Sequence, residues 1–130
     1  MANILVIEDN EQNLYLTTFI LERRGHRVTA ARDGRQGIQL AQELCPALML
    51  LDIQLPVMDG YAVAEALRRN PALTHIPIVA VTSYAMAGDR ERILAAGCNG
   101  YIEKPINPET FMTEVESFLS ATEIPLAGVD

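Results

Sequence analysis

The sequence predicts an α/β fold with a doubly wound parallel sheet and helices on both faces. Short apolar segments alternate with longer segments whose apolar residues recur at helical spacing, a pattern typical of parallel sheets. Several apolar segments also run directly into charged or hydroxyl residues, as strands do at the edge of such a sheet. With 130 residues, 49% of them hydrophobic, the chain can form one domain around one core.

Five segments have the composition of buried strands. The segment from Ala47 to Leu51 is apolar throughout and leads into Asp52, which predicts a central strand buried on both faces. The five strands are expected at residues 3–8, 26–31, 47–52, 76–82 and 100–103.

Capping and breaking residues separate these strands and predict five helices. The helix starts are expected at Asn10, Asp33 (with Gln36 completing a capping box), Asp59-Gly60, Met86 and Asn107-Pro108. The corresponding ends are expected at Gly25, Pro46, Asn70-Pro71, Gly97 and about Ala121. Because the helical pattern then lapses, we predict one domain over residues 1–121 and a flexible C-terminal tail over residues 122–130.

The composition excludes several classes of function. A formal charge of −7 opposes non-specific binding to nucleic acid, and the basic residues form only short pairs. No apolar segment approaches the ~20 residues of a membrane span, so we expect no membrane insertion and a cytoplasmic protein. Cys45 and Cys98 have no disulfide or metal-site spacing and are expected to be reduced and mostly buried, and His26 and His75 to lie at the surface.

The polar residues that follow the predicted strands indicate the candidate site. They are Glu8-Asp9, Asp52, Thr82-Ser83 and Glu103-Lys104. The carboxyl ends of parallel strands share one edge of the sheet, so carboxylates, a hydroxyl and a lysine are expected to converge there. Such a set suits an aspartate that accepts a phosphoryl group beside a divalent cation.

The chemistry of this set assigns a role to each residue. Mg²⁺ prefers oxygen ligands and retains several waters. We therefore expect Asp9 and Asp52 to bind it directly, Glu8 through water, and Gln54 through its backbone carbonyl. An acyl phosphate on Asp52 would place its oxygens where Lys104 can pair with one and the Thr82 hydroxyl can bond another.

The same residues, taken in order, carry a family resemblance. They are Glu8-Asp9, Asp52-Ile53-Gln54-Leu55-Pro56-Val57-Met58-Asp59-Gly60, Thr82 and Lys104-Pro105. As a set they resemble the receiver domain of two-component response regulators (CheY-like), over residues 3 to about 120. The stretches 52–56, 76–82 and 85–89 are similar to stand-alone DivK-type regulators and to the receiver modules of hybrid histidine kinases.

This resemblance implies a flavodoxin-like, CheY-like sheet of strand order 2-1-3-4-5. It implies Mg²⁺-dependent transfer of a phosphoryl group to Asp52 from a histidine kinase or histidine phosphotransfer protein, followed by signalling to a downstream protein. It implies that Thr82 and Tyr101 form the conformational switch and that the bond before Pro105 is cis. Gln54 and Tyr84 occupy the positions at which the family tunes the lifetime of the acyl phosphate.

Partner docking is predicted from the position of the site. A phosphohistidine protein must reach the edge that holds Asp52. Asn13 and Leu16, three residues apart on the first predicted helix, and Pro105 and Ile106 after the last strand are expected to form its docking surface.

Three functions remain open on sequence. The first is a phosphorylation-dependent signalling module, either an output regulator or a phosphorelay intermediate, that is not an enzyme beyond its own phosphorylation and dephosphorylation. The second is a phosphatase of the haloacid dehalogenase type, which needs an aspartate where Gln54 stands. The third is a receiver-shaped scaffold, which would be expected to lack Asp9, Asp52 or Lys104.

Overall fold

The computed structural model describes the backbone of residues 2–129 and the side chains of residues 2–119. Its centre is a five-stranded parallel sheet of order β2-β1-β3-β4-β5. The strands are β1 (Asn3–Ile7), β2 (Arg27–Ala31), β3 (Leu48–Asp52), β4 (Ile78–Thr82) and β5 (Gly100–Glu103). The predicted fold class and strand order are confirmed, and the strand bounds differ from prediction by at most two residues.

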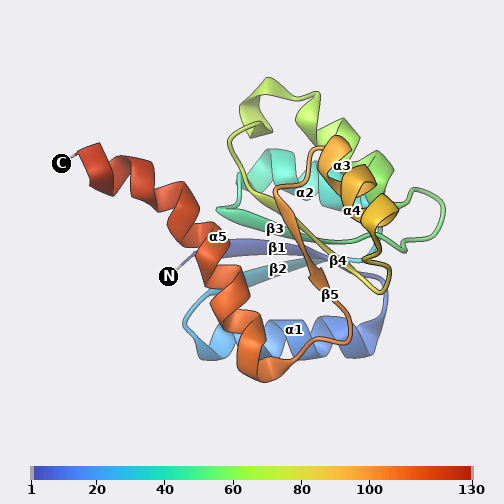
Figure 1. Cartoon of the computed structure of the whole chain (residues 1–130), viewed down its shortest axis with the longest axis horizontal. Helices are drawn as coiled ribbons and strands as arrows, with labels where there is room; N and C mark the ends of the chain where they lie inside the picture. Colours follow the sequence, from blue (N-terminus) through green and yellow to red (C-terminus); the bar gives the residue numbers. More distant parts are fainter. Residues whose placement is uncertain (1, 130) are drawn as a thin grey trace.

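Helices cover both faces of the sheet, with α1 and α5 on one side and α2, α3 and α4 on the other (Figure 1). The helices are α1 (Glu11–Arg23), α2 (Gly34–Leu44), α3 (Gly60–Arg68), α4 (Ala87–Ala95) and α5 (Pro108–Val129), with a short 3-10 turn at Pro71–Leu73. Three predicted caps form as expected. The side chains of Asn10, Asp33 and Asp59 each accept a hydrogen bond from the backbone N–H three residues later.

The alternation of side chains along the strands divides the core in two. Leu5, Met49 and Ile78 face α2, α3 and α4. The intervening strand residues, such as Ile4 and Leu48, pack with residues of α1 and α5. All five residues of β3 and of β4 are buried, as expected for central strands of a doubly wound sheet.

Three expectations drawn from the sequence differ from the structure. Helix α5 continues along the backbone to Val129, past the expected end near Ala121, because a helix can continue through a proline such as Pro125 at the cost of one hydrogen bond. The boundary of the predicted tail at residue 122 stays a prediction. Cys45 is exposed, where burial was expected, and it lies at the C-cap of α2 in a left-handed backbone conformation. Cys98 is buried, as expected. The third concerns His26, whose side chain is only 8% exposed because α5 packs over the entry to β2.

Candidate phosphoacceptor site

The carboxyl ends of four strands bring the predicted residues together at one edge of the sheet. β1 and β3 are neighbours at the point where the strand order reverses, which is where open α/β sheets bind ligands. Ile7 is paired with Leu51, so Glu8 leaves β1 beside Asp52. Thr82 ends β4, and Lys104 follows β5.

Three carboxylates form the floor and rim of this site. Glu8, Asp9 and Asp52 each offer an oxygen within 4.8 Å of the others. Glu8 and Asp52 are buried, whereas Asp9 is exposed at the rim. The Lys104 ammonium lies 3.3 Å from Glu8 Oε1 and 3.2 Å from Asp52 Oδ1, and the Lys104–Pro105 peptide bond is cis as expected. Lys104 therefore contacts two of the three acids.

The crowding raises the pKa of Glu8 to about 7, from an ordinary value of 4.5. Burial is the largest cause, followed by the hydrogen bond and the negative charge of Asp52. The Asn10 backbone N–H, which donates to Glu8 Oε2 at 3.2 Å, and Lys104 act in the opposite direction. At neutral pH the Glu8 carboxyl of the metal-free site is therefore protonated about half of the time, and a bound cation would favour its ionised form.

The segment after β3 holds Asp52 in place. The Gln54 N–H donates to Asp52 Oδ1 at 3.0 Å. A Cβ on Gly60 would lie 2.6 Å from the Asp52 carbonyl oxygen and from the Ile53 Cα, so only glycine lets α3 start this close to the end of β3. The Asp59-Gly60 pair, predicted only as a helix start, therefore also supports the position of Asp52.

Thr82 is buried, and its hydroxyl is bonded on several sides. Thr82 Oγ1 accepts hydrogen bonds from the Tyr84 N–H at 3.0 Å and from Gln54 Nε2 at 2.9 Å. It also donates to the Tyr84 carbonyl at 3.3 Å. The contact between Gln54 and Thr82 was not predicted, because the sequence placed Gln54 near the acyl phosphate without indicating where its side chain bonds.

Tyr101, predicted as a switch residue, lies half-buried on β5. It packs against the core on the side of α2, α3 and α4. The Arg90 guanidinium lies over its ring at 5.4 Å from the centroid, and Arg90 Nε donates to the Ala85 carbonyl. Arg90 therefore connects α4 to Tyr101. The switch role itself stays a prediction.

An open cavity of about 480 Å³ lies over these groups. It is lined by Glu8, Asp9, Asn10, Glu11, Asn13, Asp52, Gln54, Ser83, Tyr84 and Lys104. Of the predicted docking residues, Asn13 lies in its wall and Pro105 is exposed. Leu16 and Ile106 are half-buried against the core of α1 and α5. Each thus exposes only part of its side chain, and the docking role stays a prediction.

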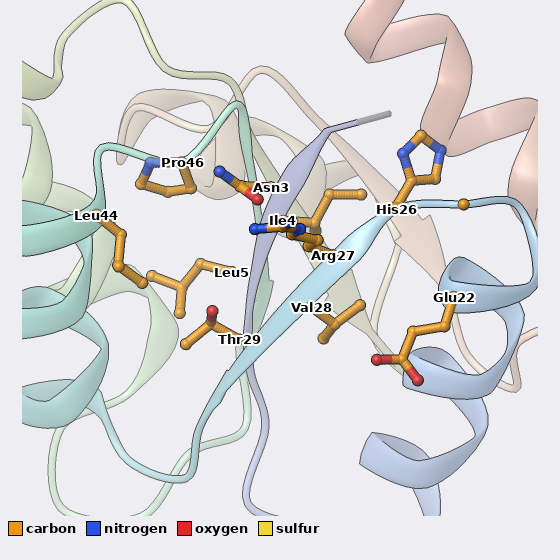
Figure 2. A pocket seen from close by; sticks show the side chains of 11 residues that line it. Asn3, Ile4, Leu5, Glu22, His26, Arg27, Val28, Thr29, Leu44 and Pro46 are labelled. Atoms are coloured by element: carbon orange, nitrogen blue, oxygen red, sulfur yellow. The ribbon is translucent and has the colours of Figure 1, made fainter.

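A second cavity, of about 580 Å³, lies near the other end of the sheet. Its lining residues come from both sides of β2, with Leu44 and Pro46 on one side and Glu22 and His26 on the other (Figure 2). His26 Nδ1 accepts a hydrogen bond from the Ala2 N–H at 3.2 Å, so the histidine is tied to the chain start. The acid cluster lies outside this cavity and lines the first one, which is therefore the cavity that holds the predicted site residues.

Comparisons with known proteins agree with this geometry. The family model of the response regulator receiver domain matches residues 4–116. The chain belongs to the response regulator receiver family. It is similar to the polar-differentiation response regulator DivK of Brucella anthropi, with 41% identity over 117 residues that cover 90% of this chain and 95% of that protein.

Solved structures of receiver domains have the same fold. The receiver domain of a sensor histidine kinase from Pseudomonas aeruginosa is 34% identical, with a TM-score of 0.84 over 92% of this chain and 98% of that one. That structure is described with a magnesium ion coordinated in its active-site cleft. Chemotaxis protein CheY4 of Vibrio cholerae is 27% identical, with a TM-score of 0.87 over 91% of this chain and 98% of that one.

The family fixes the general class of function. Receiver domains are signalling domains of two-component systems that interact with histidine kinases and downstream targets and bind magnesium at an acidic pocket. In the part of this receiver domain that the structure describes, no helix has both the length and the apolar composition needed to cross a membrane.

Proposed function

We propose that this protein is a two-component response regulator that accepts a phosphoryl group on Asp52 and signals through a conformational change to a protein partner. The donor is a phosphohistidine on a histidine kinase or histidine phosphotransfer protein, and the reaction takes place in the cytoplasm. The observation that carries the proposal is the Lys104 ammonium between two buried carboxylates, beside the exposed carboxylate of Asp9.

The donor set fits Mg²⁺. Its three carboxylates lie close enough to share one ion, and the site opens to solvent, which leaves room for the waters that Mg²⁺ retains. Asp9 and Asp52 would bind it directly, Glu8 through water, and Gln54 through its backbone carbonyl. When bound, Mg²⁺ supplies positive charge that offsets the repulsion between Asp52 and the incoming phosphoryl group.

The protein's own groups position the reaction. A carboxylate oxygen of Asp52 forms the bond to phosphorus while the bond from phosphorus to the donor histidine nitrogen breaks, and that nitrogen keeps the electron pair. Lys104 lies near enough to Asp52 to pair with a phosphoryl oxygen. Thr82 and Tyr101 then change position, and the surface of α4, β5 and α5 reports the change to a partner.

The alternative of a haloacid dehalogenase-type phosphatase lacks support. That mechanism needs a second carboxylate two residues after the nucleophile, and the Gln54 side chain there bonds Thr82. A scaffold that never accepts phosphate would have no need of a buried acid cluster that raises the pKa of Glu8. Whether the protein acts as an output regulator or as a relay intermediate depends on which downstream protein it binds.

Transfer from purified phosphohistidine proteins tests the proposal. Wild type should gain one phosphoryl group from a cognate donor. Leu16→Ala and Ile106→Ala should slow that transfer several-fold, because each removes apolar area from the predicted docking surface, while labelling by acetyl phosphate stays within twofold. Leu44→Ala, at an exposed leucine on the opposite end of the fold, is the matched control.

Two results would contradict this account. If no phosphohistidine protein in a broad panel labels a chain that acetyl phosphate labels, the kinase-dependent role is wrong. If Leu16→Ala and Ile106→Ala slow both reactions equally, these residues support the fold and not the docking of a donor.

A further inference from the structure

We infer that the Gln54 side chain is a latch that holds Thr82 in its resting position and so sets how readily phosphorylation activates the protein. This inference rests on the proposed function, since it concerns the response to a phosphoryl group on Asp52. It assigns to Gln54 a positioning role on the switch hydroxyl, separate from its backbone N–H bond to Asp52 and from the cation contact proposed for its carbonyl.

The first step is that the Thr82 hydroxyl has no free hydrogen-bonding capacity at rest. A hydroxyl has one donor and two acceptor positions. The Tyr84 N–H and Gln54 Nε2 fill the two acceptor positions, and the Tyr84 carbonyl takes the proton. To donate to a phosphoryl oxygen on Asp52, Thr82 must therefore give up its bond to the Tyr84 carbonyl. Because the acceptor positions of the hydroxyl turn with its proton, this also weakens the bond from Gln54 Nε2.

The second step is that Gln54 is itself held at both ends of its amide. Nε2 donates to Thr82 at 2.9 Å, and Oε1 accepts from the Ser83 N–H at 3.4 Å. The backbone N–H of the same residue donates to Asp52 Oδ1. Gln54 thus connects the phosphoacceptor at the end of β3 to the switch residue at the end of the neighbouring strand β4.

The third step is that Gln54 separates Thr82 from the cavity. Gln54, Ser83 and Tyr84 line the cavity over Asp52, whereas Thr82 does not and is only 1% exposed. A phosphoryl group that enters this cavity meets Gln54 before it can reach the Thr82 hydroxyl. Displacement of the Gln54 side chain is therefore part of activation and opposes it.

The size of the effect follows from the bond that is lost. One net hydrogen bond shifts an equilibrium by about two- to tenfold. If the bond stabilises only the resting position, its removal raises the population of the active position by that factor, and the apparent affinity for a phosphoryl mimic rises equally.

The experiment measures binding of beryllofluoride, a phosphoryl mimic, in the presence of Mg²⁺. Gln54→Met keeps the length of the side chain and removes both amide bonds. We expect it to raise the apparent affinity about fivefold and to move the amide resonances of Thr82 and Tyr101 in the free protein toward their positions in the bound form.

Two further variants exclude a merely structural or steric effect. In a Thr82→Ala background Gln54→Met should change the affinity less than twofold, because the bond it removes is already absent. Gln39→Met makes the same substitution at an exposed position of α2 that lies outside the cavity and removes an amide bond to Glu43, so it should also change the affinity less than twofold.

The outcomes separate the latch from the proposed function. If wild type neither binds beryllofluoride nor accepts phosphate on Asp52, the proposed function is wrong and the latch with it. If wild type responds but Gln54→Met leaves the affinity unchanged or lowers it, or if the increase persists in Thr82→Ala or appears in Gln39→Met, the latch alone is overturned.

Discussion

The two ends of the sheet each contain a basic side chain at the centre of a cluster, and the two clusters differ in kind. At the carboxyl end, Lys104 lies between Glu8 and Asp52, and the charges there are unbalanced. At the amino end, Arg68 reaches from α3 to the loops that precede β4 and β5. Its Nε donates to the Gly97 carbonyl at 2.8 Å.

The other nitrogens of Arg68 are also satisfied. One donates to the carbonyls of Leu73 and Thr74, and the other to Asn99 Oδ1 at 2.8 Å. The same Asn99 oxygen accepts the N–H of Ile78, which begins β4. All these acceptors are neutral, so the Arg68 cluster joins four segments without any repulsion between like charges.

This difference indicates that the two ends of the sheet have different roles, one in stability and the other in binding. The amino end stabilises the fold, because every nitrogen of the Arg68 guanidinium donates to a neutral acceptor there. The carboxyl end lowers the stability of the metal-free protein, and such a cost is typical of sites that bind a cation or a charged substrate. Variants at the two ends should therefore have opposite effects on stability, and only variants at the carboxyl end should change phosphorylation.

The largest effect on stability is expected at the amino end. Arg68→Ala should lower the free energy of unfolding by about 3 kcal/mol, because it removes several hydrogen bonds and leaves carbonyl groups without a donor. Urea unfolding measures this change. Arg69→Ala, at an exposed neighbour, should change stability by no more than about 0.5 kcal/mol. Equal effects of the two variants would contradict the role assigned to the Arg68 cluster.

A smaller effect of opposite sign is expected at Glu8. Its pKa is about 7 in the folded protein and 4.5 ordinarily, so the folded state binds more protons between these values and stability falls as pH rises through that window. In chelator at pH 8, Glu8→Gln should therefore be more stable than wild type by about 2 kcal/mol, and less dependent on pH.

Urea unfolding between pH 5 and pH 8 checks this prediction, with Glu22→Gln on the exposed face of α1 as the control. A wild-type protein that gains stability across the same window would show that Glu8 is ionised in the folded state throughout.

Magnesium binding distinguishes the acids from one another. Asp9→Ala should weaken Mg²⁺ binding about tenfold or more, and Glu8→Ala should weaken it less, because loss of a direct ligand costs more than loss of a ligand that acts through water. Calorimetric titration at pH 8 measures both affinities. The reverse order would exchange the roles of the two residues.

The sequence predicted the convergence of the site but not its internal contacts. Parallel strands place their carboxyl ends at one edge, so the convergence of Glu8, Asp52, Thr82 and Lys104 followed from their positions after the predicted strands. The bond from Gln54 to Thr82 depends on the rotamer of a loop side chain, which residue spacing does not determine.

The same limit applies away from the site. The burial of His26 depends on how α5 packs over the start of β2, and the Arg68 cluster joins loops distant in sequence. Neither arrangement has a local sequence signal. In the sequence, Arg68-Arg69 is simply one of the short basic pairs.

The most direct test of the account compares phosphorylation in variants of the two ends. Wild type, Asp52→Asn and Arg68→Ala are incubated with acetyl phosphate and Mg²⁺, under conditions in which each remains folded, and the mass of the intact protein is measured. We expect wild type and Arg68→Ala each to gain one phosphoryl group and Asp52→Asn to gain none. Labelling of Asp52→Asn to the level of wild type would contradict the assignment of Asp52 as the phosphoacceptor.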